Sequence, residues 1–159
     1  VAERYSFVAE PVELHFSEEL PVREARVWVH PNKAKERRVR VGRIFISRED
    51  FERFKGKEVR LLHLFNVVFD ARARARVTST EVKDVPKINW VSEHVSASVL
   101  MPDGKFVRGL AERAIERLKK LECVQFERFG FVSYQGKLKK ESRKRGEEGE
   151  EHEFWFAHK

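Results

Sequence analysis

The sequence is poor in thiols and in long apolar segments, and both shortages narrow the classes of protein that fit. Its 159 residues include a single cysteine, Cys123, so no internal disulfide can form and no second thiol is present for a zinc cluster. No apolar run approaches the roughly 18 residues that a membrane-spanning helix needs. The N-terminus also lacks the charged-then-apolar order of a signal peptide. We therefore expect a soluble, cytoplasmic chain without a membrane partner.

Patterns typical of catalytic centres are missing as well. The histidines at positions 15, 30, 63, 94, 152 and 158 show no metal-ligand spacing such as His-Glu-x-x-His. There is no glycine-rich phosphate loop, no nucleophile beside a base and no carboxylate pair. We expect no catalytic residue, no metal site and no cofactor within this chain.

What the sequence does contain is positive charge. Lysine and arginine number 33 against 26 acidic residues, which gives a net charge of +7 and an isoelectric point near 9.7. Such a balance favours a polyanionic partner, with nucleic acid first and an anionic membrane surface second. The length suits one compact domain or two intimate subdomains.

Short segments of alternating apolar and polar residues predict a β-rich architecture. Residues 3–9, 11–16 and 25–30 have the period of half-buried strands, and the last ends at a turn over 30–33. In residues 39–46 the apolar phase shifts at Gly42, which predicts one bulged strand. With frequent turns and one or two short helices, this pattern indicates an all-β, barrel-like fold.

Three further segments are distinctive. Ser47 can cap a short helix that ends at Gly56. Residues 109–121 have apolar spacing that leaves a helix and a non-helical segment equally open. Residues 136–153 carry a basic run and then an acidic run without apolar period, which predicts a solvated, mobile loop.

An arginine ladder is expected in the middle of the chain. Residues 58–64 and 66–80 resemble a strand pair, and in the second Arg72, Arg74 and Arg76 alternate with small apolar residues. Two interpretations remain open. The guanidiniums form a solvated face paired to acidic neighbours, or they contact phosphates, which adds affinity without base choice.

The segment 123–134 mixes aromatic residues with planar polar groups that suit an unstacked base. Gln125 and Arg128 supply the amide and the guanidinium, whereas Phe126 is expected in the core. In a regular strand Gln125 and Arg128 point to opposite faces. Both can therefore meet the same RNA only if the strand twists or bulges near Gly130.

Several motifs resemble the C-terminal anticodon-binding region of class I glutamyl- and glutaminyl-tRNA synthetases. They are Arg-Tyr-Ser-Phe-Val at 4–8, His-Pro-Asn-Lys at 30–33, Gly-Lys-Glu-Val-Arg-Leu at 56–61, Ile-Asn-Trp-Val-Ser at 88–92 and Cys-Val-Gln-Phe-Glu-Arg-Phe-Gly-Phe-Val at 123–132. Leu-Met-Pro-Asp-Gly at 100–104, Gly-Leu-Ala-Glu at 109–112 and Phe-Trp-Phe-Ala-His-Lys at 154–159 are most similar to the archaeal glutamyl version.

The resemblance implies two β-barrels, whose topology in this family resembles a small ribosomal protein that binds 5S rRNA. It places residues 1–55 and 106–159 in a proximal barrel and 56–105 in a distal barrel. The family's catalytic domain, with its His-Ile-Gly-His and Lys-Met-Ser-Lys-Ser signatures, precedes this region, and neither signature occurs here. Because the chain opens at Val1 inside a strand-like segment, we expect a piece of a longer ligase that uses ATP and Mg²⁺.

The resemblance also implies site residues. Arg4, Arg60, Gln125 and Arg128 match positions that read anticodon bases in the glutaminyl relatives, and Lys57 is a candidate by position. Leu62 replaces an arginine of the glutaminyl pattern, so the pocket for one base must differ.

The expected function is recognition of the anticodon of glutamate tRNA, and of glutamine tRNA in enzymes that charge both, without an obligate protein partner. Two alternatives remain open. A free-standing rRNA-binding barrel of ribosomal-protein type would have the same fold and charge. A protein-interaction module would use the aromatic and charged surfaces without RNA.

Overall fold

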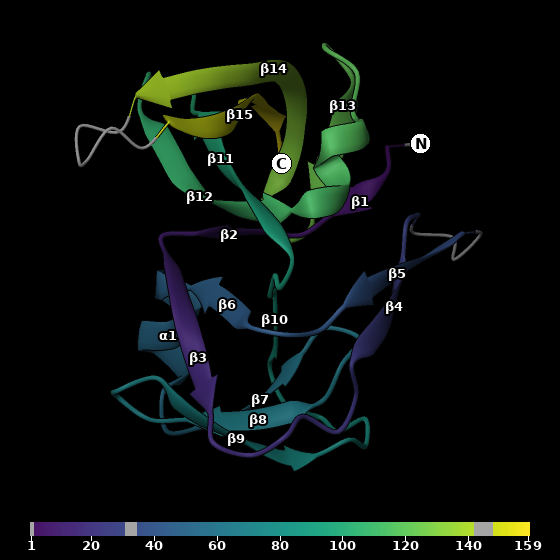
Figure 1. Cartoon of the computed structure of the whole chain (residues 1–159), viewed down its shortest axis with the longest axis vertical. Coiled ribbons are helices and arrows are strands. Elements are labelled where there is room, and N and C mark those ends of the chain that lie inside the picture. Colours follow the sequence, from purple (N-terminus) through teal and green to yellow (C-terminus); the bar gives the residue numbers. More distant parts are fainter. Residues whose placement is uncertain (1, 31–34, 142–147) are drawn as a thin grey trace.

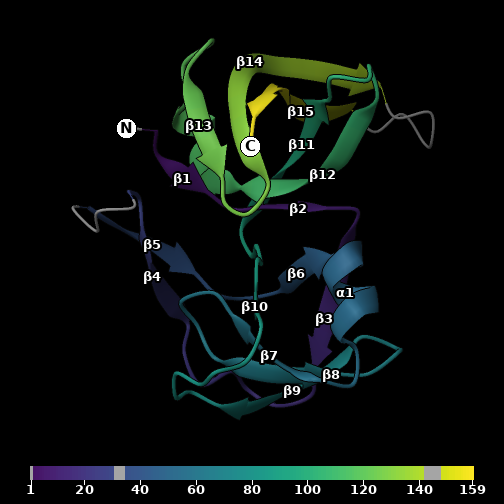
Figure 2. The ribbon, with the colours of Figure 1, turned by 180° about the vertical axis from the view of Figure 1, so that it is seen from behind.

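Two nearly closed, barrel-like sheets lie one above the other, and a separate hairpin stands beside them (Figure 1). The view from behind shows the same two-layer arrangement (Figure 2). This computed structural model describes residues 2–30, 35–141 and 148–159. Most of the predicted turn at residues 30–33 lies outside the described residues. The prediction of an all-β fold with two barrels and little helix is confirmed.

The upper barrel is a seven-stranded sheet with the order β1-β13-β14-β15-β11-β12-β2. Its strands are β1 (Arg4–Tyr5), β2 (Phe7–Ala9), β11 (His94–Leu100), β12 (Phe106–Glu112), β13 (Cys123–Phe126), β14 (Gly130–Glu141) and β15 (Glu148–His158). Phe126 is fully buried in its core, where its ring stacks on Phe7 at 4.9 Å and contacts Phe154 at 4.7 Å. Phe126 is thus the core residue that the sequence predicted.

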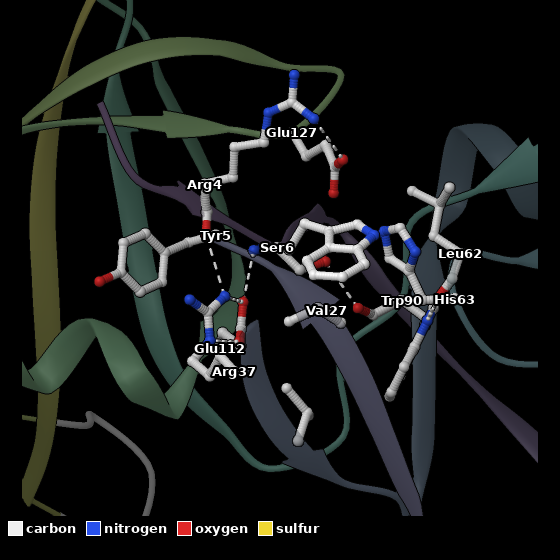
Figure 3. Close-up of a pocket in the computed structure, with 12 residues that line it drawn as sticks. Arg4, Tyr5, Ser6, Val27, Arg37, Leu62, His63, Trp90, Glu112 and Glu127 are labelled. Carbon is white, nitrogen blue, oxygen red and sulfur yellow. Dashed lines mark hydrogen bonds and ion pairs between the residues drawn. The ribbon is translucent and has the colours of Figure 1, made fainter. Parts of the chain in front are cut away.

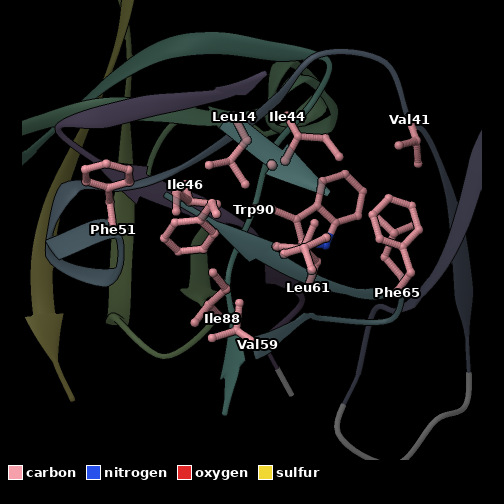
Figure 4. Close-up of a cluster of buried hydrophobic side chains, with 14 of the residues drawn as sticks. Leu14, Val41, Ile44, Ile46, Phe51, Val59, Leu61, Phe65, Ile88 and Trp90 are labelled. Atoms are coloured by element: carbon pink, nitrogen blue, oxygen red, sulfur yellow. The ribbon is translucent and has the colours of Figure 1, made fainter. Parts of the chain in front are cut away.

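The lower barrel is a six-stranded sheet with the order β10-β7-β8-β9-β3-β6. Its strands are β3 (Pro11–Phe16), β6 (Ile44–Ser47), β7 (Glu58–Leu61), β8 (Asn66–Phe69), β9 (Arg74–Ser79) and β10 (Lys87–Ile88). Its core is built from branched and aromatic side chains such as Ile44, Leu61, Phe65 and Trp90 (Figure 4).

Strand pairing groups residues 4–9 with 94–158 in the upper barrel and residues 11–16 and 44–47 with 58–88 in the lower barrel. An isolated bridge pairs Phe45 of β6 with Val91, in the segment that leads from β10 of the lower barrel to β11 of the upper barrel. The division into a proximal barrel of residues 1–55 and 106–159 and a distal barrel of 56–105 stays a prediction about folding units.

The helix α1 (Arg48–Phe54) forms where the sequence predicted it. The Ser47 hydroxyl accepts a hydrogen bond from the Asp50 amide at 3.2 Å, which satisfies one of the free donors of the first turn. Phe51 is buried and stacks on Phe69 at 5.6 Å. After the helix, Gly56 has φ +80°, a conformation that favours glycine.

The hairpin of β4 (Glu24–Trp28) and β5 (Glu36–Arg40) belongs to neither barrel. The predicted bulged strand over 39–46 is wrong, because β5 ends at Arg40 and β6 begins at Ile44 in the lower barrel. Between them the Gly42 amide donates to Ser92 Oγ at 2.7 Å. The change of apolar phase at Gly42 therefore marks a crossing between two sheets.

Residues 66–80 form two strands, so the predicted continuous strand is also wrong. β8 and β9 are joined by a tight turn in which one Asp70 carboxylate oxygen accepts the amides of Arg72 and Arg74, and Ala73 has φ +61°. In turns, aspartate side chains commonly accept backbone amides that would otherwise bond to a neighbouring strand. Arg72 consequently lies in the turn, and only Arg74 and Arg76 are on the strand.

The two remaining segments differ from the expectations in part. β12 continues to Glu112 and is followed by a 3₁₀ helix, η1 (Arg113–Arg117), so the open question over 109–121 is resolved as strand and then helical turn. The predicted loop over 136–153 is wrong at both ends, because β14 and β15 stay paired as far as Glu141 and Glu148. Across these two strands Lys137 Nζ lies 3.1 Å from a carboxylate oxygen of Glu150. Residues 142–147 lie outside the described residues.

Candidate nucleic-acid interface

The first predicted reader, Arg4, lies beside Gln125 although 121 residues separate them in the sequence. β1 and β13 pair in parallel with Arg4 opposite Gln125. Arg4 Nε donates to Gln125 Oε1 at 3.3 Å, and Arg4 Nη1 lies 3.6 Å from Glu127. The Arg4 side chain is 30% exposed. The structure thus brings a guanidinium and an amide together at one edge of the upper barrel, with donors and acceptors suited to base edges.

The main chain of Arg4 is held by the hairpin. The Arg4 amide donates to Val29 O at 2.7 Å, and Arg37 Nη2 donates to Arg4 O at 3.0 Å. Arg37 also forms a two-bonded ion pair with Glu112 at 2.7 and 3.0 Å, and its guanidinium lies over the Tyr5 ring (Figure 3). The buried ion pair joins β5 to β12, and the bond from Arg37 to Arg4 O ties β1 to both.

A turn follows β13 and carries the second predicted reader. The strand ends at Phe126, and the Phe129 amide donates to Phe126 O at 2.9 Å. Arg128 is exposed and has φ +63°. An irregularity is therefore present between Gln125 and Arg128 as a tight turn after β13, and the register of β14 against β15 also shifts between Phe131 and Val132, next to Gly130.

Gly130 is essential to the geometry of this turn. Its φ is +151°, and a Cβ built there would lie 2.6 Å from the Phe156 ring and 3.0 Å from His158 O. Only glycine fits both the conformation and the space. The approach of β14 to the C-terminal strand thus determines where the turn ends.

Arg128 faces a different surface from Arg4. It lies on a groove of about 600 Å³ between α1, β10 and the turn, whose polar lining includes Asp50, Arg53, Lys87 and Asn89. Burial raises the pKa of Asp50, opposed by the Ser47 hydrogen bond and the charge of Arg128. The structure does not bring Arg128 into contact with the Arg4–Gln125 pair among the described residues.

Asn89 connects the groove to the turn. Its amide group donates to the main-chain oxygen of Glu127, while its Oδ1 is buried without a hydrogen-bond partner in the described part of the chain. The residue lines the groove. The groove thus gathers the cations Arg128 and Lys87 and the amide group of Asn89, residue types whose donors and acceptors match nucleobase edges.

His63 borders the Arg4 side of the interface, in a small pocket with Leu62, Trp90 and Glu127 (Figure 3). Burial lowers the pKa of His63, and the charge of Glu127 opposes this. Its φ is +63°, so His63 and Arg128 are two left-handed, non-glycine residues around one interface. Such strain is concentrated at functional sites.

The other predicted readers have different environments. Arg60 is 9% exposed, and its guanidinium donates to Asn66 Oδ1 and to the carbonyl oxygens of Leu64, Thr80 and Glu81. It holds the segment after β9 against the lower barrel. Lys57 is exposed between α1 and β7.

The arginine ladder lies away from these groups. Arg72, Arg74 and Arg76 are exposed around β9, at the opposite end of the molecule from β1 and β13 (Figure 1). Arg74 pairs with Asp70 at 2.8 Å, whereas the guanidiniums of Arg72 and Arg76 have no partner among the described residues. Arg74 has the acidic neighbour that the solvated interpretation expects, whereas the guanidiniums of Arg72 and Arg76 stay open to the phosphate-binding interpretation.

Sequence reasoning missed four polar residues of the interface: Arg53, His63, Lys87 and Asn89. Asn89 stands inside the motif Ile-Asn-Trp-Val-Ser, and Trp90 Nε1 donates to Leu62 O at 2.8 Å. The place of Asn89 inside that motif was the available signal. His63 was considered only as a metal ligand.

Within residues 2–30, 35–141 and 148–159, no group of three or more His, Cys, Asp or Glu side chains could hold a metal ion. No helix in the same part of the chain is long and apolar enough to cross a membrane.

Comparison with known proteins gives a consistent result. The family described as "tRNA synthetases class I (E and Q), anti-codon binding domain" matches residues 2–85, and a second profile of the same description matches residues 87–135. A glutamate–tRNA ligase of Pyrococcus furiosus is 37% identical over 151 residues, covering 83% of this chain and 26% of the relative. Proteins of that name from Korarchaeum cryptofilum and Methanocaldococcus jannaschii are 34% and 33% identical, with 83% and 82% of this chain and 26% of each relative covered. The chain spans about a quarter of the length of these relatives.

Proposed function

The chain belongs to the anticodon-binding domains of class I glutamyl and glutaminyl tRNA synthetases, and we propose that it reads unstacked anticodon bases of glutamate tRNA. The observation that carries the proposal is the Arg4–Gln125 pair. A guanidinium and an amide from opposite ends of the chain meet at an exposed edge without forming part of a core. Such paired planar groups recognise single-stranded bases by their Watson–Crick edges.

In this proposal the interface has two sides. Arg4 and Gln125 take one base on the His63 side. Arg128, Lys87 and Asn89 take a neighbouring base on the groove side, with the β13–β14 turn between them. A loop whose bases are splayed apart can straddle the turn in this way.

Arg60 acts indirectly in this scheme. Two of its four acceptors, the carbonyl oxygens of Thr80 and Glu81, lie on the segment that leads toward Lys87, so Arg60 orders the groove. A direct base contact would require its guanidinium to leave these acceptors. Lys57 and the ladder residues Arg72, Arg74 and Arg76 are proposed as phosphate contacts that add affinity without base choice.

We further propose that the complete protein is a glutamate–tRNA ligase acting in translation in the cytoplasm. Its catalytic residues, ATP and Mg²⁺ would belong to a part of the protein outside these residues. Glutamine tRNA is a second substrate candidate, as the resemblance to archaeal glutamyl enzymes that charge both tRNAs implies.

Arg128→Ala tests the base-reading role. Loss of one bidentate base contact should cost about 1–3 kcal/mol of binding free energy. We expect this loss for a transcript with a glutamate anticodon and a smaller loss for an anticodon-swapped transcript, measured by filter binding at fixed salt.

Arg76→Ala is the matched control, since it removes an exposed arginine at the far end of the molecule. It should weaken both transcripts equally or leave both unchanged. An equal loss for both transcripts with Arg128→Ala would contradict base reading by Arg128.

A further inference from the structure

The β4–β5 hairpin has one open face and one covered face, which is bonded to the upper barrel at Arg4 and packs on the core of the lower barrel through Ala25 and Val39. On the bonded face, Val29 and Arg37 hold the main chain of Arg4, and Arg37 pairs with buried Glu112. Ala25 is buried on the same face. The hairpin is therefore a rigid extension of the strand that carries the first reader.

Two arginines face each other on the open face. Arg26 and Arg38 are directly opposite in the antiparallel register, and both are exposed. Neither guanidinium has a hydrogen bond or an ion pair with any described residue. Like charges directly opposite destabilise a strand pair, so this arrangement costs free energy in the unbound protein.

Nearby acidic residues do not neutralise the pair. Residues 23–29 and 35–43 contain seven basic and two acidic side chains. The acidic ones, Glu24 and Glu36, form no ion pair among the described residues, and Arg40 reaches only Glu93, at 4.0 Å. An uncompensated pair of arginines is complementary to phosphate, which guanidinium groups bind through two parallel hydrogen bonds.

We propose that Arg26 and Arg38 bind phosphates of the RNA strand whose bases reach Arg4 and Gln125. This inference rests on the proposed function and adds to it a surface outside both barrels. The direct bonds from the hairpin to Arg4 favour RNA over other anions, because a strand that presents a base to Arg4 passes beside the hairpin. Phosphate binding here would add affinity and salt dependence but no choice of base.

The test is a salt titration of binding to an anticodon stem–loop RNA, with the complete 159-residue chain. Arg26→Gln/Arg38→Gln should reduce the slope of log affinity against log salt by about 1.4–1.8, the effect of two lost phosphate contacts. Affinity should fall most at low salt. Thermal unfolding should show a midpoint equal to or above that of the wild type, since a like-charge pair is removed.

Lys105→Gln/Arg108→Gln is the matched control. It removes the same two charges from exposed positions at the β11–β12 end of the upper barrel. We expect its slope to stay near that of the wild type. Equal slopes for the two double variants would overturn the proposal, because the effect would then come from net charge alone.

Two further readouts separate the explanations. The preference of the wild type for the glutamate anticodon tests the proposed function. Arg26→Gln/Arg38→Gln should keep that preference while its log affinity depends less steeply on log salt. If the double variant differs from the wild type only in binding to vesicles of phosphatidylserine and phosphatidylcholine, the hairpin binds lipid and the proposal is wrong.

Discussion

Replacing Arg37 by alanine should be among the most destabilising substitutions available in this chain. Its guanidinium makes two bonds to Glu112, at 2.7 and 3.0 Å, and one to Arg4 O at 3.0 Å. The side chains of the ion pair are 10% and 7% exposed. Removing one partner of a buried pair leaves an uncompensated charge and costs about 3–5 kcal/mol. A typical domain has only about 5–15 kcal/mol of stability in total.

The measurement is equilibrium unfolding in urea, followed by tryptophan fluorescence from the three tryptophans. Arg26→Ala is the control, because it removes an exposed arginine from the other face of the same hairpin. It should change the free energy of unfolding by no more than about 0.5 kcal/mol. The double variant Arg37→Ala/Glu112→Ala should lose less free energy of unfolding than the two single variants together, since each single variant leaves the other buried charge without its partner. A loss below about 1 kcal/mol for Arg37→Ala would refute the reasoning.

Two further predictions concern stability. Gly130→Ala should lower the free energy of unfolding by about 1–3 kcal/mol, because the new Cβ combines an unfavourable positive φ with a contact at 2.6 Å to the Phe156 ring. Gly104→Ala is the control, since Gly104 has φ +84° and no atom within 4 Å, so that variant measures the cost of the backbone conformation alone. Equal losses for the two variants would contradict a clash at Gly130. Burial lowers the pKa of His152, whose Nδ1 lies 2.6 Å from the Tyr134 hydroxyl, so the unfolded chain binds the proton more readily. Its contribution to stability should therefore be complete above the ordinary pKa of 6.5 and decline as the pH falls through that value. Urea unfolding of His152→Gln between neutral and acidic pH should show a shallower decline, and an unchanged slope would contradict this.

Sequence rules predicted the structure correctly where the deciding contacts lie within a few residues along the chain. Ser47 predicted the start of α1 because its hydroxyl competes for the free amides of the first turn, and that bond is present. The requirement for irregularity between Gln125 and Arg128 came from the two-residue period of a strand, and the turn after Phe126 meets it.

Long-range placement could not be deduced in the same way. Arg60 has the residue type of a reader, but its burial depends on carbonyl groups about 20 residues away that no local pattern indicates. The opposite error occurred at residues 136–153, where charge runs suggested a loop. The backbone of both runs pairs as strands, and Lys137 forms an ion pair with Glu150 across them, which is visible only once the register is known.

The ladder shows a third cause of error. Alternation alone placed Arg72 on a strand with Arg74, but Asp70 accepts both their amides and closes a turn first. A short polar side chain two or four residues away can thus override a periodic pattern.

The parallel pairing of β1 with β13 has a consequence for how the protein is made. Residues 4–5 meet their partners only after residues 123–126 have been synthesised, while the strands of the lower barrel come from the intervening residues. Contacts of such long separation form slowly because the loop must close before they contribute. The lower barrel can therefore assemble while the reader edge is still open. A chain that stops before residue 123 would therefore hold the strands of the lower barrel but not the Arg4–Gln125 pair, which needs both β1 and β13.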